Sequence, residues 1–160
     1  KINKNLIKKI KDDEQNISKK AFHNFSKRIK RVKNDLINFM KKNQPIIGYG
    51  ASTKGNIVLN YCNVNSVQMP YICDANKQKS GKFTPGTNIK IISKEKMRLL
   101  NPKYMLVLIW SFRSEIIKQE LSYIKKGGNL IFHLPKFHII NKKNYRNFIN
   151  KDFRNFSYEY

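Results

Sequence analysis

Apolar and polar residues follow one pattern before Pro45 and another after it. In the first stretch, apolar residues recur at steps of three and four, which places them on one face of a helix; they are Phe22, Phe25, Ile29, Val32, Leu36, Phe39 and Met40. We therefore predict a helical arm over residues 1–44 that packs through this face, with Ser18 as an N-cap. Pro45 ends the arm, because proline disfavours helix at the residue before it.

After Pro45, short apolar runs alternate with amphipathic stretches. These predict strands over 46–49, 71–73, 88–92, 104–110 and 129–134, and helices over 54–61, 93–100 and 112–125. The run 104–110 is apolar throughout, as expected of a central strand that is covered on both faces. The order predicts a Rossmann-like α/β fold over 45–140, in which a parallel sheet lies between two layers of helices. Residues 141–160 are predicted to form a C-terminal tail.

Charge narrows the choice of partners. The chain carries 33 Lys+Arg against 10 Asp+Glu, a formal net charge of +23, which invites a nucleic-acid interpretation. However, only six of the cations are arginine, the residue that contacts bases and phosphates through two hydrogen bonds. Asn and Ile are abundant too, with 20 and 21 residues, which indicates a coding bias. We interpret the charge as a solvated lysine-rich surface that favours anionic ligands and binds nucleic acid only non-specifically.

Composition also bears on location and metal chemistry. The longest purely apolar run is far shorter than the roughly 18 residues of a membrane span, and no secretory signal is readable. We predict no membrane association and a cytoplasmic location. Cys62 and Cys73 are expected to be buried free thiols, with no metal site. The chain begins with Lys rather than Met, and it is either a segment of a longer enzyme or a stand-alone chain.

A glycine-rich turn joins the first predicted strand to the next helix. Its residues are Gly48, Tyr49, Gly50, Ala51, Ser52, Thr53, Lys54, Gly55 and Asn56. Glycines permit close backbone approach, a helix N-terminus offers unpaired N–H groups, and hydroxyls and a lysine add donors, which together suit a diphosphate. The spacing matches neither the dinucleotide fingerprint nor the NTPase loop. A tight connection that binds no ligand is the alternative.

Four further residues are candidates. Asp74 follows the second predicted strand, where an acid can accept from ribose hydroxyls, or it is satisfied by the turn 76–81. Trp110 and Arg113 flank the end of the central strand, where they suit stacking on a base and pairing with a phosphate. A core tryptophan and a helix-terminal arginine are the alternatives. For His133, an acid–base role and a satisfied strand histidine both remain open.

Four sequence blocks occur together in a recognisable order. The first is the turn 48–56; the others contain Asp74, Asn76, Lys79, Gly81, Thr84, Pro85, Gly86, Thr87 and Ile89, then Trp110, Phe112, Arg113, Glu115 and Ile116, then Gly127, Gly128, Leu130, Ile131, Phe132, Leu134 and Pro135. Over about residues 20–140 they resemble the C-terminal domain of the S-adenosylmethionine-dependent sugar C-methyltransferases, which methylate a carbon of nucleotide-linked keto-sugars.

The resemblance implies a Rossmann-like domain that helps to hold a nucleotide sugar against a central methyltransferase domain of the same or another chain. It implies that S-adenosylmethionine and the catalytic base belong to that central domain, so we expect no cofactor and no catalytic residue on this chain. The implied substrate-binding segments are 48–56 and 84–87, with Asp74, Lys79, Trp110 and Arg113 as further contacts. The alternatives are a nicotinamide-dinucleotide domain, a non-catalytic basic binding module, and a purely structural domain.

Overall fold

The computed structural model describes residues 3–15 and 19–152. The chain divides into two compact units, residues 1–31 and 32–160, which are described separately. The N-terminal unit contains helix α1 (Lys4–Gln15) and the first part of helix α2 (Lys19–Lys42). The predicted N-cap, Ser18, lies outside the described residues.

The predicted apolar face of the arm is buried only in its second half. Within the C-terminal unit, Leu36 and Met40 of α2 are 0% and 1% exposed. Phe22 and Phe25, on the part of α2 that belongs to the N-terminal unit, are 63% and 55% exposed. The expectation of a packed arm therefore holds for the last turns of α2 and not for its beginning.

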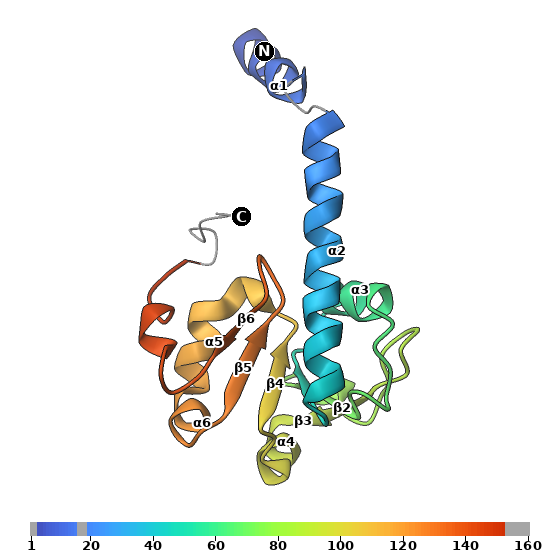
Figure 1. The fold of residues 1–160 in the computed structure, drawn as a ribbon, viewed down its shortest axis with the longest axis vertical. Helices are drawn as coiled ribbons and strands as arrows, with labels where there is room; N and C mark the ends of the chain where they lie inside the picture. The colour runs from blue at the N-terminus through green and yellow to red at the C-terminus, as the bar shows by residue number, and fades with distance from the viewer. Residues whose placement is uncertain (1–2, 16–18, 153–160) are drawn as a thin grey trace. The chain divides into compact units, whose positions relative to one another are not determined.

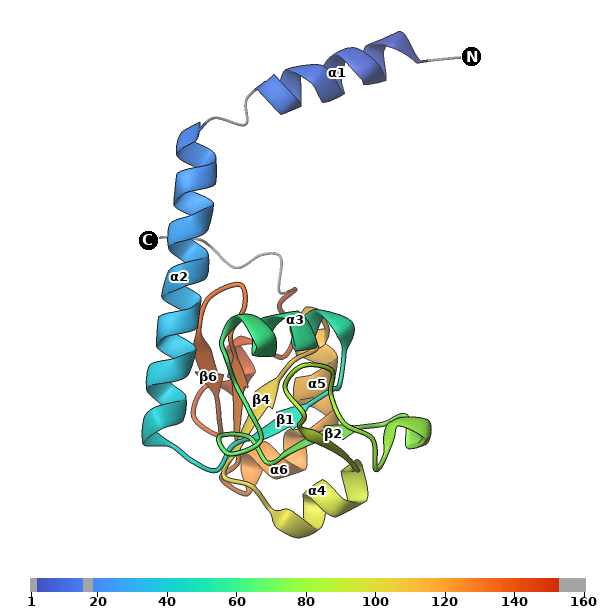
Figure 2. The same ribbon diagram turned by 90° about the vertical axis from the view of Figure 1, so that its right-hand side faces the viewer.

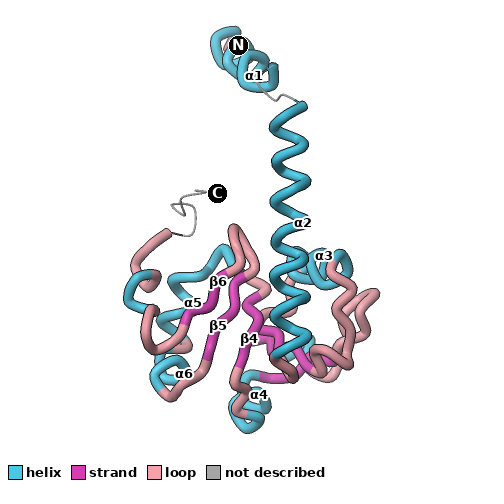
Figure 3. Tube along the Cα trace, in the orientation of Figure 1, coloured by secondary structure: helices cyan, strands magenta, loops and turns pink. Residues whose placement is uncertain are grey.

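The C-terminal unit is built on a six-stranded sheet (Figures 1 and 3). Its strands are β1 (Ile47–Tyr49), β2 (Tyr71–Asp74), β3 (Lys90–Ser93), β4 (Tyr104–Val107), β5 (Asn129–Phe132) and β6 (His138–Ile140). Their order is β3-β2-β1-β4-β5-β6, and all neighbours are parallel except β5 and β6. This confirms the α/β Rossmann-like prediction. The chain reverses its winding between β1 and β4, which makes their shared carboxyl edge a topological switch point.

Helices cover both faces of this sheet (Figures 1 and 2). One face packs against the end of α2 and against α3 (Thr53–Tyr61); the other packs against α4 (Lys94–Leu100), α5 (Arg113–Gln119) and α6 (Leu121–Lys125). Strand residues alternate between the two cores, since Leu106 belongs to the first and Met105 and Val107 to the second. Cys62 and Cys73 are buried free thiols, as predicted, and burial raises the pKa of Cys73 to about 12.

Three elements differ from the sequence prediction. Strand β4 ends at Val107, and the residues after it lead into the 3-10 turn η2 (Trp110–Phe112). The helix predicted over 112–125 is divided at Glu120 into α5 and α6. Strand β6 was not predicted, because its register with β5 depends on a reversal after Pro135 rather than on a local pattern. Beyond it, the 3-10 turn η3 (Tyr145–Asn147) packs near the core.

The break at Glu120 coincides with a buried polar cluster. Glu120 is 1% exposed, accepts a hydrogen bond of 2.8 Å from the Tyr49 hydroxyl, and forms an ion pair with Arg98 of α4. Burial and the nearby carboxylate raise the pKa of Tyr49, while the hydrogen bond to Glu120 raises that of Arg98. The cluster joins β1, α4 and the α5–α6 junction. It therefore fixes one helix layer against the sheet.

Removing the two ionic partners should have unequal effects on stability. Arg98→Ala leaves the Glu120 carboxylate buried without a cation, and we expect the free energy of unfolding to fall by about 3–5 kcal/mol. Glu120→Gln retains an acceptor for Tyr49 and leaves an arginine side chain that is already 44% exposed, so the expected loss is about 1–2 kcal/mol. Urea unfolding at pH 7 measures both. Equal losses, or a larger loss for Glu120→Gln, would contradict this account.

Candidate functional site

Several predicted site residues meet at the carboxyl edge of the sheet. The glycine turn follows β1, Asp74 ends β2, Trp110 lies just beyond β4, and His133 follows β5. Open α/β sheets bind ligands at this edge, next to the switch point. The order of the strands thus brings together residues that are far apart in the sequence.

Hydrogen bonds within the protein occupy the inner amides of the turn. Gly50, with φ at +87°, donates from its amide to the Cys73 carbonyl at 2.8 Å. The Ala51 amide donates to a carboxylate oxygen of Asp74 at 2.8 Å, and the Ser52 amide donates to the Gly50 carbonyl at 2.9 Å. Three of the amides that we predicted to bind a diphosphate therefore already donate to acceptors within the protein.

The beginning of α3 leaves other donors open. Ser52 is its N-cap, because its hydroxyl accepts from the Gly55 amide at 3.0 Å and donates to the Leu108 carbonyl at 3.3 Å. In the described part of the chain, the amides of Thr53 and Lys54 have no acceptor, as is usual in a first helical turn. Both residues are exposed. The turn thus presents two amides, a hydroxyl and an ammonium group.

Gly55 explains how the turn is held against the loop after β4. A Cβ atom at this position would lie 2.6 Å from the Leu108 side chain, so a larger residue would push α3 away from the sheet. The next residue, Asn56, continues the helix by donating its amide to the Ser52 carbonyl at 2.9 Å. Glycine is therefore needed at Gly55 because α3 packs closely on the loop after β4.

Asp74 and Lys79 act together on the turn. Besides Ala51, the Asp74 carboxylate accepts from the Asn76 amide at 2.8 Å and from the Lys79 ammonium at 3.2 Å. The same ammonium donates to the Ala51 carbonyl at 2.9 Å. Lys79 belongs to the 3-10 turn η1 (Lys77–Lys79). Both groups of Ala51 are therefore held by this pair, which gives Asp74 and Lys79 a positioning role.

The segment 84–87 is tied to the far end of α3. The hydroxyls of Thr84 and Thr87 lie 2.6 Å apart and are buried, and Thr84 also accepts from the Ile89 amide at 2.9 Å. The Asn60 side-chain amide donates to the Pro85 carbonyl at 3.2 Å. Gly86 has φ at +78°, and a Cβ atom there would clash with Asn60. Sequence reasoning missed Asn60, since nothing in its local sequence signals this contact.

The side chains of three predicted substrate contacts, Trp110, Arg113 and Tyr49, are engaged within the protein. Trp110 is half-buried and meets the His133 ring edge-on, with 4.8 Å between ring centroids. Arg113 is 1% exposed and donates at 3.3 Å to the carbonyls of Lys151 and Asp152, and burial lowers its pKa. Tyr49 directs its hydroxyl to Glu120, away from the turn. The Arg113 side chain is therefore engaged away from the glycine turn, and the Tyr49 hydroxyl, although its backbone belongs to that turn, is bonded to Glu120.

His133 is a buried polar group without a described partner. It is 0% exposed, and neither ring nitrogen has a hydrogen bond within the described residues. Burial, and to a lesser extent His138, lowers its pKa to about 4. The imidazole is therefore neutral at physiological pH.

Cavities also open away from the glycine turn. Two of them, of about 490 and 430 Å³, open near the amino ends of the strands, and no residue of the glycine turn lines either one. Over residues 3–15 and 19–152, no three His, Cys, Asp or Glu side chains gather as a metal site would require. The helices of that same part of the chain include none with the length and apolar character of a membrane span.

Comparison with known proteins identifies the family. The family model described as "C-methyltransferase C-terminal domain" matches residues 2–135. The chain belongs to this family. A relative, the C-methyltransferase NovU of Streptomyces niveus, is 35% identical over 95 residues, which is 59% of this chain. The match spans 23% of NovU, so this C-methyltransferase C-terminal domain corresponds to about a quarter of that relative's length.

In this C-methyltransferase C-terminal domain, two glycines with positive φ give a matched pair of substitutions. Gly81→Ala adds a Cβ in open space and should cost about 1–2 kcal/mol through φ alone. Gly86→Ala adds the clash with Asn60 and should cost about 1–3 kcal/mol more. Thermal or urea unfolding measures the difference. Asn60→Ala in the Gly86→Ala background should recover part of the loss, and equal costs at the two glycines would disprove the contact.

His133 makes stability of the domain dependent on pH. Its folded pKa of about 4 lies below the ordinary 6.5, so the unfolded chain takes up a proton first as the pH falls. Stability should therefore fall between pH 6.5 and 4, by about 3 kcal/mol from this group. His133→Phe should flatten the profile while leaving stability near pH 8 unchanged or higher. His138, whose pKa is also lowered to about 4, should maintain a residual slope. Identical profiles for wild type and variant would refute the assignment.

Proposed function

We propose that this chain is the substrate-binding C-terminal domain of an S-adenosylmethionine-dependent C-methyltransferase that acts on a nucleotide-linked keto-sugar. The family supports the C-methyltransferase part. The substrate is supported by the donors at the switch point, which suit a diphosphate. Methyl transfer itself belongs to the rest of the enzyme in this proposal, and this domain binds and orients the substrate.

The observation that carries the proposal is the open N-terminus of α3. The Thr53 and Lys54 amides have no acceptor among the described residues, and the Lys54 ammonium extends from the same turn. Backbone amides and the positive end of a helix dipole favour phosphate groups. Because Asp74 occupies the inner amide of Ala51, we place the diphosphate at Thr53 and Lys54 rather than deeper in the turn.

Asp74 also bears on where S-adenosylmethionine binds. A cofactor ribose at this kind of fold is usually held by the acid that ends the second strand. Here that acid already accepts from Ala51, Asn76 and Lys79. The residues of the turn thus do not fit the cofactor, and we assign S-adenosylmethionine, which supplies the methyl group, to another part of the enzyme.

The remaining site residues shape the pocket around the substrate. The half-buried Trp110 offers an aromatic surface near the turn for stacking on a base or sugar. Asn60 of α3 holds the segment 84–87 through the Pro85 carbonyl. Because the proposed diphosphate site is at the N-terminus of the same helix, α3 fixes both parts of the site. Arg113 holds the segment that carries Lys151 and Asp152, and we assign it no substrate contact.

Titration calorimetry with a nucleoside-diphosphate sugar tests the proposal. Lys54→Ala should weaken binding by about tenfold, because a charge-assisted contact is lost. Lys118→Ala, an exposed lysine on α5, is the matched control and should change affinity by less than about twofold. The parent nucleoside, which lacks the diphosphate, should bind far more weakly. Equal binding of nucleoside and nucleoside diphosphate, or tighter binding of NADH, would reject this function.

A further inference from the structure

A cavity lies at the edge of the sheet opposite the glycine turn. It has a volume of about 490 Å³, which is within the range of small-molecule sites. Its walls come from the end of α4, from the residues that lead into β4, and from α6 with the two glycines that follow it. It shares no residue with the proposed substrate site.

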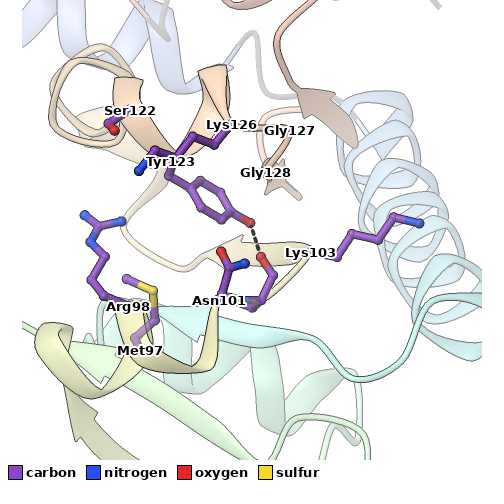
Figure 4. A pocket seen from close by; sticks show the side chains of 10 residues that line it. Met97, Arg98, Asn101, Lys103, Ser122, Tyr123, Lys126, Gly127 and Gly128 are labelled. Carbon is purple, nitrogen blue, oxygen red and sulfur yellow. Dashed lines mark hydrogen bonds between the residues drawn. The ribbon is translucent and has the colours of Figure 1, made fainter.

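Cationic and hydroxyl groups gather on one side of this cavity. Figure 4 shows the side chains of Arg98, Ser122 and Lys126 converging there, whereas Lys103 extends away from them. None of the lining residues is acidic. Lys126 and Ser122 are exposed, and no hydrogen bond from the Ser122 hydroxyl is recorded within the described part of the chain. Two like charges that face one cavity repel each other, and a bound anion relieves that repulsion.

Arg98 is held in place by the buried Glu120 carboxylate. Glu120, which is buried, forms an ion pair with one terminal nitrogen of the Arg98 guanidinium, and Arg98 also lines the cavity. A buried carboxylate thus fixes the direction of an exposed cation. A surface lysine without such a fixed neighbour remains solvated, so its contribution to binding is small.

The Tyr123 ring, packed on Gly128, forms a further wall of the cavity. The Tyr123 ring packs on Gly128, where a Cβ atom would clash with it, and the Tyr123 hydroxyl donates to the Pro102 carbonyl at 2.9 Å (Figure 4). That hydroxyl is therefore a structural group. Gly127, with φ at +101°, has open space around its Cβ position, whereas Met97 is 0% exposed and belongs to the core beneath the cavity. The cavity accordingly combines cationic groups that can bind an anion with room for an organic group.

We propose that this cavity binds a phosphate monoester, with the phosphoryl group held by Arg98, Ser122 and Lys126. Arg98 comes from α4, whereas Ser122 and Lys126 lie one turn apart on α6 and its C-cap, so two cations and a hydroxyl from two elements suit a doubly charged phosphoryl group. The organic group lies in the open space beside Gly127, against the Tyr123 ring. The site is separate from that of the nucleotide sugar and does not depend on it.

The test uses inorganic phosphate and phenyl phosphate, titrated calorimetrically at constant ionic strength. We expect saturable one-to-one binding that Lys126→Ala weakens by about tenfold and Ser122→Ala by about threefold. Lys125→Ala removes the neighbouring exposed lysine, which does not line the cavity, and should change affinity by less than about twofold. Phenyl phosphate should bind more tightly than inorganic phosphate, since only it packs against the Tyr123 ring.

Amide chemical shifts distinguish this site from the substrate site. Phosphate should shift the amide signals of Gly127 and Gly128, and Lys126→Ala should abolish those shifts. Shifts confined to Thr53 and Lys54 would instead show that phosphate occupies the glycine turn, and would overturn the proposal. It also fails if binding does not saturate, or if Lys125→Ala and Lys126→Ala weaken it equally.

Discussion

The hydrogen bond between the Ala51 amide and the Asp74 carboxylate is the contact on which the carboxyl edge of the sheet depends. It joins the turn after β1 to the end of β2, and Lys79 completes the arrangement by bonding to both residues. An internal anion thus occupies a place at which many nucleotide-binding turns meet their ligand. In the proposed function, an external anion is therefore placed further out, at the first turn of α3.

The same constraint extends along α3. Gly55 allows the helix to approach Leu108. At the other end of the helix, Gly86 leaves room for the Asn60 side chain, which donates to the Pro85 carbonyl. Helix α3 therefore carries the open amides at its N-terminus and anchors the segment 84–87 near its C-terminus. Two of the four blocks that suggested the family are linked through this one helix, which explains why their glycines are needed even where no ligand touches them.

The sequence predicted most of the parallel strands and helices, but it predicted neither strand β6 nor the long-range contacts. Strands β1, β2 and β5 were predicted to within two residues, since short apolar runs end at glycine, aspartate or proline. The predicted extent of β4 was too long, because the residues after Val107 are also apolar but belong to a loop. Arg113 could not be placed from sequence, since the carbonyls that it binds lie 38 and 39 residues later. The Glu120 cluster likewise depends on three separate elements.

The net charge does not show which lysines could bind an anion, but the groups beside each lysine do. Lys79 is held by Asp74 inside the glycine turn and is therefore engaged within the protein. Lys54 and Lys126 are exposed, each beside groups whose positions the fold fixes: the first amides of α3 in one case and the Arg98 guanidinium in the other. A long, mobile ammonium group gains specificity only from such fixed neighbours, because ordering it alone costs side-chain entropy. On this argument, the two proposed anion sites at opposite edges of the sheet draw on fixed neighbours, whereas cations without such neighbours add to the charge of +23 but not to specific binding.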